Sequence, residues 1–193
     1  MQARLSANDL ACRRGDRVLF RGLALEMGAG EALHVRGANG VGKTTLIRAL
    51  AGLLTPFAGR IDRVGAVGIV DERTALDPDL PLGKALRFWQ QLDMCDNALD
   101  ALETLGLRQL LDVPVRYLST GQRKRAALAQ LLGQDADIWL LDEPLSGLDS
   151  GAIEIVIALI RDHCAEGGIA LIASHQDIAY NGLKTLSLGD YAK

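Results

Sequence analysis

The residues best suited to chemistry lie in one short glycine-rich stretch, residues 37–45. There, glycine, four residues, glycine, lysine and threonine follow one another at the spacing of a phosphate-binding loop. Glycines let backbone N–H groups turn toward a phosphate chain, and a helix that follows adds the positive end of its dipole. We therefore predict that these residues contact a nucleotide: Gly37, Ala38, Asn39, Gly40, Val41, Gly42, Lys43, Thr44 and Thr45.

The types of two residues in this stretch predict their individual roles. Lys43 is expected to reach the β- and γ-phosphates, and the Thr44 hydroxyl to hold Mg²⁺. The flanking residues supply the elements that the loop needs. Residues 31–36 alternate as in a strand, and residues 46–52 have helical spacing that ends at a glycine. This strand, loop and helix are the context in which the pattern binds phosphate.

A second group of chemically competent residues lies about a hundred residues further along the chain. Four apolar residues, 138–141, end in Asp142 and Glu143, as in a buried strand that finishes in two acids. Such a strand delivers Asp142 to the carboxyl edge of a sheet, beside the phosphate loop. Asp142 then suits Mg²⁺ next to Thr44, and Glu143 is placed to polarise an attacking water as a general base.

Composition and patterning indicate the protein class. The chain has 193 residues, 49% of them hydrophobic and 23% charged, as expected for one compact domain. A net charge of −3 gives no electrostatic reason to expect direct nucleic-acid binding. No apolar run reaches the roughly 18 residues that cross a bilayer, and the N-terminus leads into no signal-peptide core. We therefore expect a cytoplasmic protein.

Hydrophobic periodicity predicts strands that alternate with helices. The first third is strand-rich, with a turn expected at Gly22 and a strand at residues 64–70. Helices are expected at residues 82–93, 98–105, 121–132 and 153–164, and buried strands at residues 138–141 and 169–173. This alternation favours an α/β fold whose mostly parallel sheet is covered on both faces, with the helical middle as an insertion.

The cysteines and two of the histidines are expected to be structural. Cys12, Cys95 and Cys164 are odd in number, far apart and without metal-site spacing, which favours reduced thiols. His34 and His163 have no functional context in the sequence and are expected to be ordinary packed or surface residues.

Three further motifs give the chain a family resemblance. Residues 118–122, Leu-Ser-Thr-Gly-Gln, resemble the signature motif of ATP-binding-cassette (ABC) proteins. Residues 145–149 resemble the D-loop of that family, and Ser174-His175 its switch histidine. With the phosphate loop and the acidic strand, five motifs occur in the family's order over nearly the whole chain. The resemblance implies a single ABC ATPase domain, residues 1–193, built as a P-loop NTPase. It would have a RecA-like core, an N-terminal antiparallel β subdomain and a helical subdomain inserted at about residues 75–135.

The resemblance also implies roles and partners. ATP and Mg²⁺ would be the cofactors, and two copies would form a homodimer in the ATP-bound state. Ser119, Gly121 and Gln122 of one copy would then meet the γ-phosphate that Lys43 of the other copy holds. The resemblance assigns nucleotide contact to Asp149 as well. His175 would act in catalysis beside Glu143, by contacting the γ-phosphate and the attacking water.

The chain departs from the family pattern at three places. Glu72 occupies the slot of a glutamine that senses Mg²⁺, so either Glu72 or the neighbouring Asp71 is a candidate replacement. Glu72 joins Thr44 and Asp142 as a candidate metal ligand on this basis. Residues 12–15 lack the aromatic that stacks on adenine, and an arginine plane there is an alternative. Thr120 replaces the usual glycine of the signature.

Several strings resemble one group within the family. Residues 10–23, 50–59 and 85–89 are similar to the haem-exporter ATP-binding subunits of cytochrome c maturation. That resemblance implies an ATPase peripheral to the cytoplasmic face of a bacterial inner membrane, paired with CcmB-like and CcmC-like integral membrane subunits. Hydrolysis would drive release of a haem-loaded periplasmic chaperone. The alternatives are the motor of another small-substrate ABC transporter and a soluble ABC ATPase without a membrane partner. A phosphate-loop kinase would lack residues 119–122.

Overall fold

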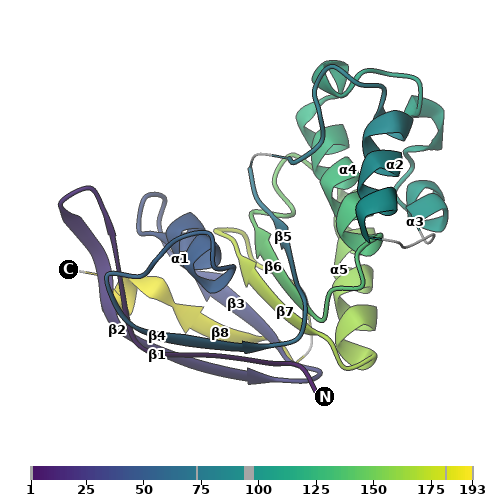
Figure 1. The fold of residues 1–193 in the computed structure, drawn as a ribbon. Helices are drawn as coiled ribbons and strands as arrows, with labels where there is room; N and C mark the ends of the chain where they lie inside the picture. The colour runs from purple at the N-terminus through teal and green to yellow at the C-terminus, as the bar shows by residue number, and fades with distance from the viewer. Residues whose placement is uncertain (1, 73, 94–97, 181, 193) are drawn as a thin grey trace. The chain divides into compact units, whose positions relative to one another are not determined.

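The computed structural model describes residues 2–72, 74–93, 98–180 and 182–192. The chain divides into two compact units (Figure 1). The first comprises Met1–Asp71, Ala136–Pro144 and Ile157–Lys193, and the second comprises Glu72–Asp135 and Leu145–Val156. Helix α5, Ser150–Ala165, begins in the second unit and ends in the first.

The first unit contains an antiparallel sheet and a parallel sheet. The antiparallel sheet has the order β2-β1-β4, with β1 at Arg4–Arg14, β2 at Arg17–Gly28 and β4 at Ala58–Val64. The parallel sheet has the order β5-β6-β7-β3-β8. Its strands are Val67–Val70, Ile138–Asp142, Ile169–Ala173, Ala32–Arg36 and Lys184–Ser187, in that spatial order.

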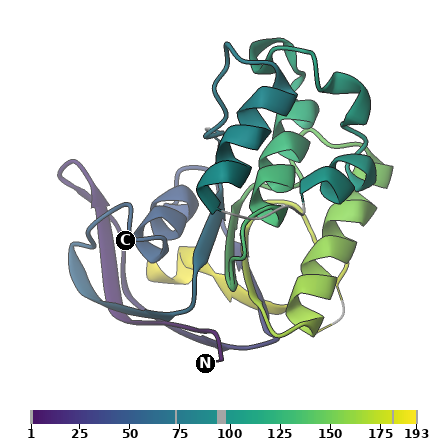
Figure 2. The ribbon, with the colours of Figure 1, turned by 45° about the vertical axis from the view of Figure 1, so that its right-hand side comes forward.

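Helix α1, Lys43–Leu50, links the two sheets of this unit (Figures 1 and 2). It contacts β1 of the antiparallel sheet and β6 and β7 of the parallel sheet. Leu46, Ile47 and Leu50 are fully buried in the same cluster as Leu5 and Phe20. Every residue of β6 and β7 is buried, which is the pattern of parallel strands covered on both faces. The fold therefore fixes the end of β6 and the start of α1 on one core.

Two predictions about the first third were wrong in detail. Gly22 is not a turn: it lies inside β2 with φ +70°, at a register shift between the pairs Leu10–Leu23 and Cys12–Phe20. A separate register shift between Ala7 and Leu10 includes Asp9 at φ +49°, and the two strands continue to pair beyond both shifts. The expected strand at residues 64–70 is two strands in different sheets, separated at Gly65 and Ala66.

Gly65 redirects the chain from one sheet to the other. Its φ of +110° is unfavourable for other residues, and a Cβ there would lie 2.8 Å from the Asp137 Cβ. The Asp137 carboxylate accepts a hydrogen bond of 2.7 Å from the Ala66 N–H. A glycine and a side-chain acceptor thus end β4 and start β5.

The second unit is helical. Its helices are α2 (Leu82–Asp93), α3 (Ala98–Thr104) and α4 (Thr120–Leu132), and α2 and α3 both contact α4 (Figure 2). Short 3₁₀ turns at Arg108–Leu110 and Val115–Tyr117 connect α3 to α4. The helices begin and end within about three residues of the predicted bounds. Within the described parts of the chain, no helix combines the length and the apolar character that crossing a bilayer requires.

Candidate nucleotide-binding and catalytic site

The loop between β3 and α1 has the backbone geometry of an anion-binding site. Gly42 precedes the helix with φ +117°, and Gly40 has φ +80°. A Cβ at Gly42 would lie 3.1 Å from the Phe20 ring, so both backbone and space favour glycine. Among the described residues, no side chain hydrogen-bonds to the start of α1 as a cap. The first N–H groups of this helix are the donors that the sequence predicted for phosphate.

Lys43, the first residue of α1, is folded back along the loop. Its side chain is 7% exposed, and Nζ donates a hydrogen bond of 2.8 Å to the Gly37 carbonyl. Nζ also lies 3.5 Å from Glu143 Oε1. The structure thus brings the lysine of the loop to the predicted general base, although 100 residues separate them.

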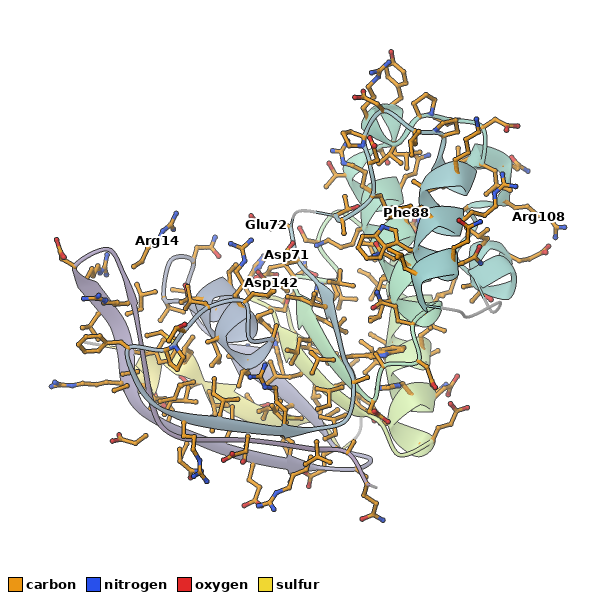
Figure 3. The ribbon with its side chains drawn as sticks, viewed as in Figure 1. Arg14, Asp71, Glu72, Phe88, Arg108 and Asp142 are labelled. Atoms are coloured by element: carbon orange, nitrogen blue, oxygen red, sulfur yellow. The ribbon has the colours of Figure 1, made fainter. Side chains whose placement is uncertain are left out.

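The two acids lie at the carboxyl edge of the parallel sheet, as the sequence predicted. Asp142 is the last residue of the buried strand β6 and is 1% exposed. Val70 pairs with Leu141, so Asp71, directly after β5, and Asp142, at the end of β6, lie at the same edge of the sheet (Figure 3). The Arg48 guanidinium donates to Asp71 Oδ2 from Nη2 at 2.8 Å and from Nε at 3.3 Å. This arginine neutralises one of the two neighbouring carboxylates.

Glu143 has an unusual backbone and a well-defined set of donors. Its φ of +46° is in the left-handed region, which costs a residue with a side chain on the order of 1 kcal/mol. Its Oε2 accepts hydrogen bonds from Ser174 Oγ at 3.1 Å and from His175 Nδ1 at 2.9 Å. Its Oε1 accepts from the His175 N–H at 3.2 Å and faces Lys43.

These donors keep Glu143 ionised. Partial burial alone would raise the pKa of Glu143, but hydrogen bonds from His175 and Ser174, with the charge of Lys43, lower that pKa below its ordinary value. A carboxylate can only accept, so the His175 ring donates from Nδ1. In the neutral ring, Nε2 is then left as an acceptor. The arrangement provides an ionised base next to a half-exposed imidazole.

In the second unit, the signature residues form the start of α4. Ser119 Oγ accepts from the Gln122 N–H at 3.2 Å, and Gln122 Oε1 accepts from the Ser119 N–H at 2.8 Å. This reciprocal pair is a capping box. A Cβ at Gly121 would lie 2.6 Å from the Gly147 carbonyl oxygen, so the loop that follows Pro144 requires glycine there. A Cβ at Gly147 would in turn lie 3.5 Å from Thr120 Cγ2, so Thr120 lies beside the same glycine.

Two more predicted site residues belong to the second unit. Asp149 precedes α5, and its Oδ1 accepts from the Ala152 N–H at 2.9 Å, as a helix cap does. Glu72 is exposed (Figure 3). The choice between Glu72 and Asp71 as the replacement for the missing glutamine is therefore between an exposed carboxylate and one that Arg48 already binds.

The arginines near the end of the first hairpin differ from each other. The Arg13 guanidinium lies 5.1 Å from the centre of the Phe57 ring, in cation–π geometry. Arg14 ends β1 and is exposed (Figure 3). Both arginines that the sequence offered for adenine are exposed, and the Phe57 ring already faces the guanidinium plane of Arg13.

The remaining histidines and the cysteines have structural surroundings. His34 is buried, with Nε2 3.2 Å from the Ser174 carbonyl oxygen, and His163 stacks on Trp139 with ring centres 3.9 Å apart. Burial lowers the pKa of both imidazoles. Burial likewise raises the pKa of Cys12 to about 11 and raises that of Cys164. Cys95 lies outside the described residues.

The residues fit a magnesium ion that is held mainly through phosphate. No group of three or more His, Cys, Asp or Glu side chains in the described ranges forms a cluster that could hold a metal. Mg²⁺ usually binds one or two protein oxygens together with substrate phosphates. The candidates for such oxygens are Asp142, which is buried at the end of β6, and Thr44, the second residue of α1.

Ser174 is a site residue whose role the sequence analysis did not assign. It follows the buried strand β7, is 1% exposed and donates to Glu143. Its position directly before His175 was the available signal, since a small hydroxyl residue at the end of a buried strand can reach the end of the neighbouring one.

Comparisons with known proteins identify the family of the chain. The model of the ABC transporter family matches residues 20–146. The cytochrome c biogenesis ATP-binding export protein CcmA of Novosphingobium aromaticivorans is 56% identical over 187 residues, covering 97% of this chain and 96% of its own length. The protein of the same name from Zymomonas mobilis is 50% identical and covers 98% of this chain and 86% of its own length.

A solved structure supports the fold. An ABC transporter ATP-binding protein from Pyrococcus furiosus superposes with a TM-score of 0.85 over 98% of this chain and 100% of its own, at 24% identity. The α/β fold expected from the ABC resemblance is therefore confirmed. The chain belongs to the ABC transporter family, in the group of cytochrome c biogenesis ATP-binding export proteins named CcmA.

Proposed function

We propose that this chain is the ATP-hydrolysing subunit of a membrane complex for haem export in cytochrome c maturation. The single observation that carries the catalytic part is the contact set of Glu143, which joins the loop lysine, the buried Ser174 and His175 at one carboxylate. The names and the high identity of the relatives support the biological part.

Phosphate binding is assigned to the loop and the start of α1. The N–H groups of residues 37–45 surround the phosphates, and Lys43 neutralises the β- and γ-phosphates. Lys43 exchanges its contact with Glu143 for the phosphate, which leaves the carboxylate facing the nucleotide. Thr44 and Asp142 hold Mg²⁺, and Glu72 is a further candidate. The ion, when bound, neutralises phosphate charge and orients the triphosphate.

Hydrolysis is assigned to Glu143 and His175. Glu143 accepts a proton from the attacking water, and its ionised state at neutral pH suits that role. His175 contacts the γ-phosphate and the water from its half-exposed ring. Because these residues follow two neighbouring buried strands, their separation is fixed by the sheet register.

The second phosphate site is assigned to the start of α4 in another copy of the chain. The nucleotide site of a homodimer formed with ATP would be completed by Ser119, Gly121 and Gln122. Asp149, in the segment that precedes α5, would contact the same nucleotide. The family supports a membrane partner. In the proposed complex the chain lies at the cytoplasmic face of the inner membrane and pairs with CcmB-like and CcmC-like integral subunits. ATP hydrolysis there would release the haem-loaded chaperone.

Replacement of Glu143 tests the catalytic assignment. Glu143→Gln keeps the hydrogen-bonding shape but removes the base, so we expect ATP binding within about threefold of wild type and turnover lowered by about 100-fold or more. Gel filtration with ATP and Mg²⁺ should show a trapped dimer. Lys84→Ala, which changes an exposed helical residue, should leave both properties unchanged. Normal turnover by Glu143→Gln would show that Glu143 is not the base.

Complementation tests the biological assignment. In a bacterium that lacks its own ATP-binding subunit for cytochrome c maturation, the wild-type chain should restore covalent c-type haem, and Glu143→Gln should not. Restored c-type haem with the inactive variant would contradict the proposed role of hydrolysis. Co-purification with a different membrane transporter, and no restoration of haem, would favour the motor of another small-substrate transporter.

A further inference from the structure

Ser174 is held by hydrogen bonds at each of its polar backbone and side-chain atoms. Its N–H donates to the Val35 carbonyl at 3.2 Å, and its carbonyl oxygen accepts from His34 Nε2 at 3.2 Å. Its Oγ accepts from the Gln176 N–H at 3.0 Å and donates to Glu143 Oε2 at 3.1 Å. The hydroxyl has a single hydrogen to donate, and Glu143 Oε2 is the acceptor that receives it.

The two oxygens of Glu143 have different surroundings. Oε2 accepts from two side chains, Ser174 and His175. Oε1 faces Lys43, at 3.5 Å, and the His175 N–H. Oε1 is thus the oxygen on the side of the phosphate loop, whereas Oε2 is the anchored oxygen.

The donors to Glu143 also differ in permanence. Lys43 must turn to phosphate when a nucleotide binds, and the His175 side chain is half exposed. Ser174 is 1% exposed and fixed by β3 and its own following turn. A buried hydroxyl that donates to a carboxylate keeps that carboxylate in place while the other donors change partners.

We propose that Ser174 is a positioning residue for hydrolysis: its buried hydroxyl anchors Glu143 Oε2, so that Oε1 stays directed toward the attacking water. This inference rests on the proposed role of Glu143 as the base. Ser174 does not touch the nucleotide in this account. It acts through Glu143, whose left-handed backbone gives the side chain no regular strand geometry to hold it.

A matched pair of variants isolates the hydroxyl. Ser174→Thr and Ser174→Val have nearly the same shape and differ chiefly in one O–H group. We expect the kcat of Ser174→Val to be about tenfold to a hundredfold below that of Ser174→Thr, the range for a buried hydrogen bond to a charged group. The KM for ATP should agree within about twofold, because Ser174 acts through Glu143 and does not touch the nucleotide.

Two further variants control for misfolding and for the position of the serine. Ser174→Ala adds no bulk, so it should fold even if the branched variants do not, and it should show the same loss of kcat against wild type. Ser6→Ala changes a serine that is also buried in the first unit but lies in β1, and it should leave kcat unchanged. Melting temperature monitors folding in every variant.

A double-mutant cycle separates positioning from structure. If Ser174 acts through Glu143, then adding Ser174→Ala to Glu143→Gln should lower kcat by less than about twofold. Equal kcat for Ser174→Thr and Ser174→Val, or wild-type kcat for a folded Ser174→Ala, would overturn the inference. So would a full loss in the Glu143→Gln background. Normal turnover by Glu143→Gln alone would instead overturn the proposed function.

Discussion

The starts of α1 and α4, both assigned to phosphate, satisfy their N–H groups in opposite ways. Before α1 stands Gly42, which has no side chain to offer, and the structure shows no side-chain cap among the described residues there. Before α4 stands Ser119, which forms a complete capping box with Gln122. The start of α1 therefore leaves its N–H groups without a side-chain acceptor among the described residues, whereas the start of α4 has the acceptor within its own capping box.

This difference suits the start of α1 to binding a nucleotide and the start of α4 to making an added contact with it. A helix start without a protein cap gains most from an anion, so the start of α1 suits tight binding of the phosphate chain. The Ser119 hydroxyl accepts from Gln122 and still has its own O–H to donate. It can therefore add one contact to a phosphate presented by another copy without losing its cap. In the proposed dimer, the start of α1 would bind the nucleotide of its own copy, and the start of α4 would contact the nucleotide of the other copy.

The largest expected effect comes from removing the charge at the first helix start. Lys43→Ala should lower ATP affinity or turnover by about 100-fold or more, because the neutralising group of the loop is lost. Isothermal titration with ATP and a phosphate-release assay measure the two quantities. Lys84→Ala is the matched control on an exposed helix surface. Wild-type hydrolysis by Lys43→Ala would remove the phosphate-loop assignment.

A smaller and more selective effect is expected at the second helix start. Ser119→Arg should leave ATP affinity within about threefold of wild type but lower turnover by about tenfold or more, since a bulky cation replaces the hydroxyl that we propose contacts the nucleotide of another copy. Ser187→Arg places the same side chain on an exposed strand residue as a control. Unchanged turnover in Ser119→Arg would contradict the assignment of this helix start to the nucleotide of another copy.

The smallest expected effect concerns the cap itself. Ser119→Ala should lower the free energy of unfolding by about 1 kcal/mol, because the Gln122 N–H loses its acceptor. Gln122→Ala should lower it by a few tenths to about 1 kcal/mol, and the double variant by less than the sum. Urea unfolding measures all three. Additive losses would mean that the two hydrogen bonds do not act as one box.

Much of the site followed from sequence because its parts are local patterns. The loop before α1, the buried strand before Asp142 and the start of α4 each depend on short-range spacing, and their helices and strands lie close to the predicted bounds. The rest of the arrangement follows from strand register. The parallel strands β6 and β7 have five residues each and end together, so the two acids and His175 lie at one edge of the sheet.

Other features depend on geometry that local patterns do not encode. Gly22 looks like a turn in sequence, but it lies inside β2 at a register shift between β1 and β2. Gly65 sits in an apolar run, and its role in changing sheets depends on Asp137, 72 residues away. The donation from Ser174 to Glu143 likewise joins residues 31 apart. Long-range partners decide these details, and one sequence does not identify them.

The backbone of Glu143 has a consequence for laboratory evolution. Its φ of +46° suits glycine or asparagine better than glutamate. A library screened for thermal stability alone is therefore expected to accumulate those residues at position 143. The selected proteins would be more stable but would lack ATPase activity. A screen for variants of higher melting temperature therefore needs an ATP turnover assay as well.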